Sequence, residues 1–293
     1  MKRVVITGMG INSCIGNTLE DVLHSLQNGI SGTRFNQTYA DLNFKSHVSA
    51  AAEQDFDNID RKLKRFMGVC AMYAYNSAVA AVEHAGLKAE DLAGNPRYGI
   101  AGGSGGGSTA SVIEMNELLE TKGARKVGPF FVPRNMTNTI TANVGVAFKL
   151  QGISHTITSA CATSADAIGY AYNQIQLGKQ DLMLAGGGEE DHWSQSLLFD
   201  AMGALCSKYN DTPETASRPY SADRDGFVIA GGGGFVVLES LEHAQARGAN
   251  ILAEVVGYAA NADGADMVAP SGEGATRCIL MALDEAKAHG VDQ

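Results

Sequence analysis

One stretch of the chain, residues 155–178, combines a short strand, a cysteine and a helix of small residues. Three of its first four residues are β-branched, which favours a strand. From Cys161 onward, alanine and glycine recur between Ile168 and Ile175 in a pattern that predicts a helix. Cys161 therefore lies at a strand-to-helix turn, where free N–H groups and the helix dipole stabilise a thiolate. This position favours covalent catalysis, and an inert buried thiol is the alternative.

The helix that follows the cysteine carries no charged residue between Asp166 and Lys179. A helix without a charged face is typically covered by other elements on most of its sides. Its alanines and glycines allow neighbouring backbone to approach closely. We therefore expect this helix to lie inside the protein, with the cysteine at its tip.

Strand and helix patterns alternate along the whole chain, which predicts an α/β fold with a largely parallel sheet. We expect strands at residues 3–7, 47–51, 98–101, 155–158, 181–185, 226–230, 234–238 and 251–258. We expect helices at residues 18–26, 66–85, 109–119, 133–148, 161–178, 194–202, 241–247 and 272–289. The strands 226–230 and 234–238 flank a run of glycines and are expected to form an antiparallel hairpin. The pattern restarts at residue 251, so we expect one domain over residues 1–250 and the beginning of a second over 251–293.

Composition and charge exclude several classes of protein. A net charge of −10 argues against general nucleic-acid binding. No apolar run is long enough to cross a bilayer, and the N-terminus lacks the pattern of a signal peptide. The five cysteines are odd in number and show no CxxC spacing, which favours reduced thiols, a cytoplasmic location and no zinc site.

Two glycine-rich segments imitate a dinucleotide-binding loop without matching it. Gly8-x-Gly10 has Ser13 where the third glycine belongs, and Gly103-x-Gly105 fails in the same way at Ser108. Tight turns at strand ends are the better interpretation, and a nicotinamide-dependent dehydrogenase is a poor alternative.

The histidines offer no convincing base for the cysteine. His155 and His192 are the two candidates, but neither has a recognisable third group to orient it. The histidines on predicted helices have solvent-facing patterns and no expected chemical role; they are His24, His84, His243 and His289.

Two basic clusters stand out on this acidic chain, one at residues 61–65 and one at residues 122–126. Such clusters are usually solvated faces. On a protein with net negative charge they also suit the capture of an acidic partner.

Read together, five segments resemble the β-ketoacyl-[acyl-carrier-protein] synthases, the condensing-enzyme branch of the thiolase-like superfamily. The segments are TSACATSADAIG, GGSGGGS, GGGEE, FDAMGAL and SRPYSADRDGFVIAGGGG. The resemblance covers essentially the whole chain and is closer to the type I branch than to type II. It implies a thiolase-like fold of two similar halves, each a mixed, mostly parallel sheet with helices on its faces, sharing a middle layer of helices.

The resemblance also implies roles for individual residues. Cys161 matches the nucleophile that takes an acyl chain from a carrier's phosphopantetheine thioester and then condenses it with a decarboxylated malonyl group. Its own N–H would be one donor of the oxyanion hole. Substrate-binding positions are Gly105, Gly106, Gly107, Ser108, Met136, Phe199, Met202 and Phe227. Asp225 is interpreted as structural. Positions that dock the carrier are Arg61, Lys62, Arg65, Arg125 and Lys126.

The family's two catalytic histidines, a lysine near the second of them and the other oxyanion donor would lie beyond Gln293. We therefore expect a part of a larger enzyme that does not condense substrates alone; a non-catalytic carrier-binding or assembly module is the alternative. The resemblance implies a homodimer with acyl- and malonyl-loaded acyl carrier protein as partners, and no nucleic-acid or membrane partner. No cofactor is expected, because 4'-phosphopantetheine arrives on the carrier, and no metal.

Overall fold

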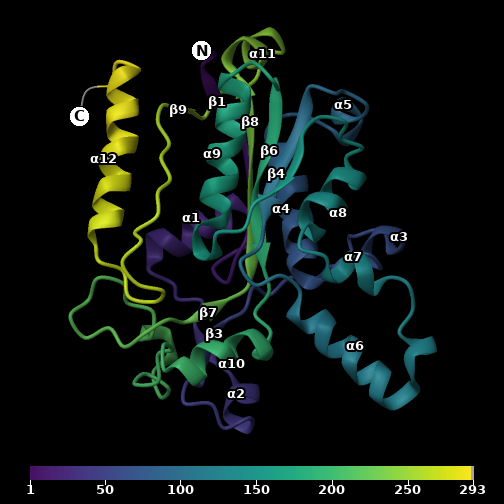
Figure 1. Ribbon diagram of the computed structural model, residues 1–293, viewed down its shortest axis with the longest axis vertical. Coiled ribbons are helices and arrows are strands. Elements are labelled where there is room, and N and C mark those ends of the chain that lie inside the picture. The colour runs from purple at the N-terminus through teal and green to yellow at the C-terminus, as the bar shows by residue number, and fades with distance from the viewer. Residues whose placement is uncertain (292–293) are drawn as a thin grey trace.

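The structure is a computed structural model that describes residues 1–291. Its centre is a six-stranded mixed sheet with helices on both faces (Figure 1). In spatial order the strands are β5 (Ser154–Thr156), β4 (Tyr98–Gly103), β6 (Leu182–Glu189), β8 (Gly232–Ser240), β1 (Val4–Asn12) and β9 (Ala253–Val255). Strands β5, β4 and β6 run parallel, whereas β8 is antiparallel to both β6 and β1. The predicted α/β fold is confirmed.

Strand β6 shows why both faces of the sheet are covered. Leu182 and Leu184 join the core on one face, and Met183 and Ala185 join the core on the other. All four side chains are fully buried. Successive side chains of a strand point to opposite faces, so an unbroken apolar run requires helices on both sides.

Helices α4 (Val69–His84) and α8 (Thr139–Ala147) cover one face, and α9 (Thr163–Gln176) covers the other (Figure 1). Behind its first turn, α9 buries Ala167, Ala171 and Ile175 completely against the sheet. The expected burial of this helix is therefore confirmed for its later turns, while Ser164 and Ala165 near its start are exposed.

Gly8 and Gly10 lie inside β1, so the prediction of tight turns at a strand end is wrong here. A Cβ atom on Gly8 would lie 2.1 Å from the carbonyl oxygen of Ala81, and one on Gly10 would lie 2.1 Å from that of Ser77. Both carbonyls belong to α4. These glycines are needed for close strand-to-helix packing.

The predicted hairpin at residues 226–238 is also wrong. Strand β7 (Ile229–Ala230) pairs in parallel with β3 (Val48–Ala50) in a second sheet that is completed by β2 (Arg34–Phe35). Only Gly231 separates β7 from β8, which is too short for the two-residue turn that a hairpin needs. The chain instead crosses from the small sheet to the central one.

The helix expected over residues 133–148 is two helices, α7 (Phe131–Asn135) and α8. The break falls at Met136, whose backbone is extended with ψ at 143°. Pro133 is tolerated in the first turn of α7, as predicted, because no intrahelical N–H is needed there.

The remaining helices agree with the sequence patterns to within a few residues or are short connectors. They are α1 (Leu19–Asn28), α2 (Gln37–Asp41), α3 (Arg61–Lys64), α5 (Ala89–Leu92), α6 (Thr109–Lys122), α10 (Trp193–Met202), α11 (Leu241–Ala246) and α12 (Glu273–Ala288). Three short 3₁₀ turns are η1 (Ala124–Lys126), η2 (Ala160–Ala162) and η3 (Pro213–Thr215). Over residues 1–291, none of the helices is sufficiently long and apolar to traverse a bilayer.

Residues after 250 pack against the first part of the chain. Strand β9 adds to the edge of the central sheet beside β1, with Val255 opposite Val4. Helix α12 stands on the α9 side of the sheet, and the segment that follows β9 runs between the two helices (Figure 1). The division of the chain at residue 250 stays a prediction.

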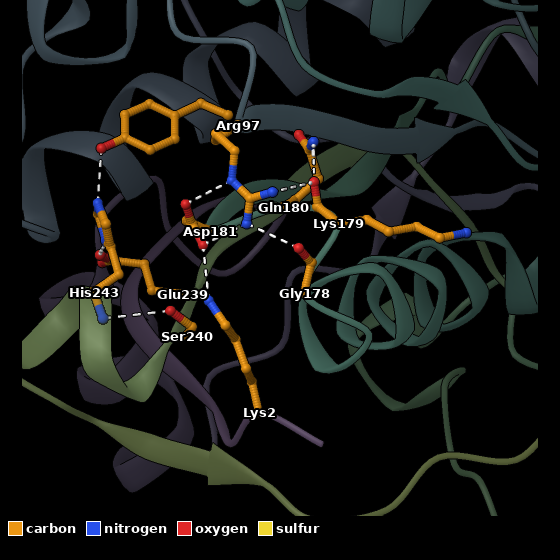
Figure 2. Close-up of polar contacts among 10 residues, drawn as sticks. Lys2, Arg97, Gly178, Lys179, Gln180, Asp181, Glu239, Ser240 and His243 are labelled. Carbon is orange, nitrogen blue, oxygen red and sulfur yellow. Dashed lines mark hydrogen bonds and ion pairs between the residues drawn. The ribbon is translucent and has the colours of Figure 1, made fainter.

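A polar network closes one end of the central sheet (Figure 2). The carboxylate of Asp181 accepts from Arg97 Nη2 at 2.7 Å and from Lys2 Nζ at 3.1 Å. His243 Nδ1 lies 2.5 Å from Glu239 Oε2, and its Nε2 lies 2.7 Å from the hydroxyl of Tyr98. The prediction that His243 faces solvent is therefore wrong, because α11 turns this residue onto the end of the sheet.

Candidate active site

Cys161 lies in η2, between strand β5 and the first residue of α9. Its side chain is exposed, whereas Cys70 and Cys206 are buried and Cys14 and Cys278 are half-buried. The predicted position of Cys161 at a helix N-terminus is therefore confirmed, and an inert buried thiol is excluded.

The residue before the cysteine has a strained backbone. Ala160 has φ at +53°, in the left-handed region that a residue with a Cβ atom rarely adopts. Such strain persists only where surrounding contacts fix it, and it is concentrated at functional sites. Here Thr163, the buried first residue of α9, fixes the turn: its hydroxyl accepts from Ser159 N at 2.9 Å and donates to Ala160 O at 2.8 Å.

A glutamate at the end of β6 holds the glycine loop beside this turn. Glu189 accepts from Ser104 Oγ at 2.5 Å, Gly105 N at 2.7 Å and Gly106 N at 3.0 Å. A Cβ atom on Gly105 would lie 3.1 Å from Ala160 O, so the loop touches the cysteine turn. Glu189 is a site residue that the sequence did not predict; its one signal is its place directly after a run of glycines that ends a buried strand.

A cavity of about 240 Å³ opens at the cysteine, where β4, β6 and β8 come together. It is lined by Gly103, Ser104, Ala160, Cys161, Thr163, Ser164, Gly187, Gly188, Glu189, Gly232, Gly233 and Gly234. A larger hollow of about 940 Å³ lies along residues 217–228 and includes Phe227, but it contains none of the residues of the cysteine turn. We take the smaller cavity as the site because it holds the accessible thiol.

The predicted substrate-binding residues fall into separate groups. Gly105 is next to the cysteine turn, and Gly106, Gly107 and Ser108 lead from it into α6. The rings of Phe199 and Phe227 meet edge to face, with centroids 6.3 Å apart. Met202 is exposed at the end of α10, and Met136 follows α7. None of these eight predicted residues lines the cysteine cavity, so their substrate-binding roles stay predictions.

None of the seven histidines, all of which fall within the described residues, lines the cysteine cavity. The ring of His155 lies beside Tyr170, with centroids 5.1 Å apart. His192 caps α10 and lies 2.8 Å from the hydroxyl of Ser194. Asp225 accepts from the backbone N–H groups of Ser207 and Lys208, both at 2.8 Å, which agrees with a structural role.

The predicted docking residues are exposed and come from two segments. Arg61 and Lys62 lie on α3 and Arg65 ends it, while Arg125 and Lys126 form most of η1. The guanidinium of Arg65 lies over the ring of Phe66 at 5.0 Å and over that of Phe130 at 4.8 Å. Phe130 follows η1 in the chain, so this stacking connects the two basic segments. Helices α3 and α7 lie on the same side of the molecule (Figure 1).

A mixed sheet covered by helices on both faces, with an accessible cysteine at the start of the helix that crosses one face, defines a thiolase-like protein. Comparison with known proteins agrees. The family described as beta-ketoacyl synthase, N-terminal domain, matches residues 1–244. The chain belongs to the β-ketoacyl synthase family.

Several relatives extend the comparison over the full chain. The chain is 54% identical over 294 residues to 3-oxoacyl-[acyl-carrier-protein] synthase 1 of Escherichia coli (strain K12), covering all of this chain and 71% of the relative. It is 50% identical to synthase 1 of Haemophilus influenzae, covering 97% of this chain and 70% of the relative. Synthase 2 of Rhizobium meliloti is 39% identical, over all of this chain and 72% of its own length. The resemblance to the type I branch is confirmed.

Solved structures show the same fold. A β-ketoacyl synthase from Burkholderia phymatum superposes with a TM-score of 0.91 at 36% identity, covering 98% of this chain and 71% of that one. A type II polyketide ketosynthase, solved in complex with its acyl-carrier protein, superposes with a TM-score of 0.83 at 30% identity. The match covers 98% of this chain and 70% of that one.

Proposed function

We propose that this chain is the nucleophile-bearing part of a 3-oxoacyl-[acyl-carrier-protein] synthase of the type I branch, an acyltransferase of fatty acid biosynthesis. The observation that carries the proposal is the accessible thiol of Cys161 at the start of α9, in a chain 54% identical to a synthase of that name.

In the proposed reaction, the Cys161 thiolate attacks the thioester carbonyl of an acyl carrier. A bond forms between the cysteine sulfur and the acyl carbon, the bond from the acyl carbon to the carrier's sulfur breaks, and the phosphopantetheine leaves as a thiolate that takes a proton from solvent. A malonyl group on a second carrier then loses carbon dioxide, and the resulting enolate attacks the acyl-enzyme. The product is a 3-oxoacyl carrier two carbons longer, and the Cys161 thiolate is released.

The surroundings of Cys161 support the first step. The N-terminal end of α9, beside Cys161, carries a partial positive charge that attracts negatively charged groups. The N–H of Cys161 is the proposed donor to the oxyanion that forms when the thiolate attacks. The cavity beside the turn is bordered mainly by glycine backbone, which leaves room for a thioester.

We also propose that acyl carrier protein docks at Arg61, Lys62, Arg65, Arg125 and Lys126, and that the enzyme is a cytoplasmic homodimer. The support for the docking surface is the exposure of these residues on a chain of net charge −10, and a carrier-bound ketosynthase of the same fold. The phosphopantetheine group would arrive on the carrier, so the proposal includes no resident cofactor or metal.

Thiol labelling tests the nucleophile. The inhibitor cerulenin should modify Cys161 and leave the other four cysteines unmodified when the digested protein is read by mass spectrometry. Cys161→Ala should abolish labelling, whereas Cys14→Ala, at a half-buried thiol outside the cavity, should label normally. Persistent labelling of another cysteine in Cys161→Ala would refute the nucleophile assignment.

A decarboxylation assay tests the reaction. The enzyme expressed from its complete reading frame should release carbon dioxide from malonyl-[acyl-carrier protein]. If that protein binds the carrier but releases no carbon dioxide, the chain belongs to a non-catalytic carrier-binding module instead.

A further inference from the structure

A hydrogen-bond relay reaches the cysteine turn from the part of the chain that follows β9. Asp166, in the first turn of α9, accepts from Ser159 Oγ at 2.5 Å through one carboxylate oxygen and from Tyr258 OH at 2.7 Å through the other. Ser159 directly precedes the strained Ala160 and the cysteine. Tyr258 is thereby connected to the nucleophile turn, although 97 residues separate it from Cys161 in the sequence.

Tyr258 fits against α9 because residue 169 has no side chain. A Cβ atom at Gly169 would lie 2.1 Å from a ring carbon of Tyr258, so the ring rests directly on the helix backbone. The N–H of Tyr258 donates to Glu285 Oε2 on α12 at 2.9 Å, which fixes the tyrosine from behind. Burial and then the hydrogen bond to Asp166 raise the pKa of Tyr258 well above its usual value, so the phenol remains a donor at neutral pH.

The other carboxylate oxygen of Glu285 accepts from a second tyrosine, Tyr172, which lies on α9 beyond Asp166. Tyr172 OH donates to Glu285 Oε1 at 3.0 Å. Tyr172 lies six residues beyond Asp166, or about 9 Å along the helix axis. The two tyrosines therefore both tie α9 to the C-terminal segment through a carboxylate, but only Tyr258 bonds Asp166 directly; Tyr172 reaches it only through Glu285 and the Tyr258 backbone.

We propose that Asp166 and Tyr258 are positioning residues that fix the Ser159–Ala160 turn and with it the direction of Cys161 during acyl transfer. The inference rests on the proposed role of Cys161 as the acyl nucleophile. Ala160 is strained in the left-handed region, so the turn relaxes when its contacts are removed. Acyl transfer depends on the placement of the Cys161 N–H at the oxyanion, and misplacement by about 1 Å slows such steps by about a hundredfold.

The experiment compares two reactions of the same sulfur in the enzyme made from its complete reading frame. Acylation of Cys161 by octanoyl-[acyl-carrier protein] needs the oxyanion donor, and alkylation by iodoacetamide does not. The ratio of the two rate constants is measured in Tyr258→Phe and Asp166→Asn, with Tyr172→Phe as the matched control. Because both rate constants come from folded protein, their ratio is independent of how much of each variant folds. Ser159→Ala is a further variant that removes the hydrogen bond between Ser159 and Asp166.

Tyr258→Phe and Asp166→Asn should each lower the ratio of acylation to alkylation by about tenfold to a hundredfold, and Tyr172→Phe should leave it unchanged. Tyr258→Phe keeps the Asp166 carboxylate, so a loss of acylation in this variant reports the position of the turn rather than a change of charge beside Cys161. An unchanged ratio in Tyr258→Phe, or an equal loss in Tyr172→Phe, overturns the inference. A wild-type enzyme that is alkylated but never acylated at Cys161 overturns the proposed function itself.

Discussion

Arg247 donates from Nη2 to Oε1 of Glu239 at 2.5 Å, and the Glu239 side chain is completely excluded from solvent. Burial by itself would raise the pKa of Glu239, but hydrogen bonds from Arg247, His243 and Thr7 outweigh it and hold the pKa at about 2. The carboxylate is therefore ionised in the folded protein at every ordinary pH.

This ion pair predicts an acid-sensitive contribution to stability. The folded-state pKa of about 2 lies below the ordinary value of 4.5, so the contribution is complete above pH 4.5 and is lost as the pH falls toward 2. Its size is about 3 kcal/mol. Glu239→Gln should lower the free energy of unfolding by about 3–5 kcal/mol at pH 7, because Arg247 loses its buried partner. The difference in free energy of unfolding between Glu239→Gln and wild type should be smaller at pH 3.

Urea unfolding at pH 7 and at pH 3 measures this difference. The exposed Glu242, in the first turn of α11, gives the control Glu242→Gln, which should behave like wild type at both pH values. A Glu239→Gln deficit that is equal at pH 3 and pH 7 would contradict the assigned pKa.

The close packing of β1 on α4 predicts a severe effect of one methyl group. Gly10→Ala should destabilise the protein by roughly 2–4 kcal/mol, because the new Cβ would lie 2.1 Å from Ser77 O and 2.5 Å from Ala81 N. Gly145→Ala is the matched control. Its Cβ would have no neighbour closer than Ile100 at 4.0 Å, and the better helix propensity of alanine should stabilise α8 by about 0.5–1 kcal/mol. Thermal unfolding of both variants tests the contrast.

The three hydrogen bonds of Glu189 predict that its charge orders the glycine loop. In Glu189→Gln the amide N–H₂ cannot accept from Gly105 or Gly106, so one or both of their N–H groups loses its partner. We expect faster hydrogen exchange at these two amides, a loss of about 1–3 kcal/mol in stability and slower acylation of Cys161. Glu117→Gln, on the exposed face of α6, should change none of these. Unaltered exchange in Glu189→Gln would show that the loop is ordered without the carboxylate.

The proposed docking surface predicts a salt-dependent association with acyl carrier protein. Reversing the charges of Arg61 and Lys62 to glutamate should slow association by about tenfold at low ionic strength and by much less in high salt. Lys179→Glu is the control, because Lys179 is an exposed lysine that belongs to neither basic segment. Stopped-flow measurements at several salt concentrations would reveal whether the two variants differ. Equal rates for both would leave Arg61 and Lys62 as ordinary solvated charges.

The features predicted correctly from the sequence are those encoded within a few adjacent residues. The β-branched residues before Cys161 and the small residues after it were sufficient to place the thiol at the start of α9. The alternation of strands and helices was sufficient for the α/β class. Each of these depends on local conformational preference and on the period of apolar residues.

The features that were missed depend on partners far away in the sequence. Strand β7 joins β3 rather than β8, and nothing near residue 229 specifies that choice. His243 has a solvent-facing pattern within α11, and only the approach of Tyr98 and Glu239 makes it part of a network. Tyr258 could not be connected with Asp166 from the sequence, because the space for its ring is provided by Gly169 on another element.

The backbone of Ala160 has a consequence for how this site tolerates change. Glycine would adopt the same left-handed conformation without steric cost, yet the chain has alanine there. The methyl group of Ala160 restricts the backbone angles next to the cysteine sulfur. The turn is therefore more rigid than with glycine, but the strain lowers the temperature at which the protein unfolds. The variant that unfolds at the highest temperature and the variant that turns over fastest should therefore not carry the same residue at position 160.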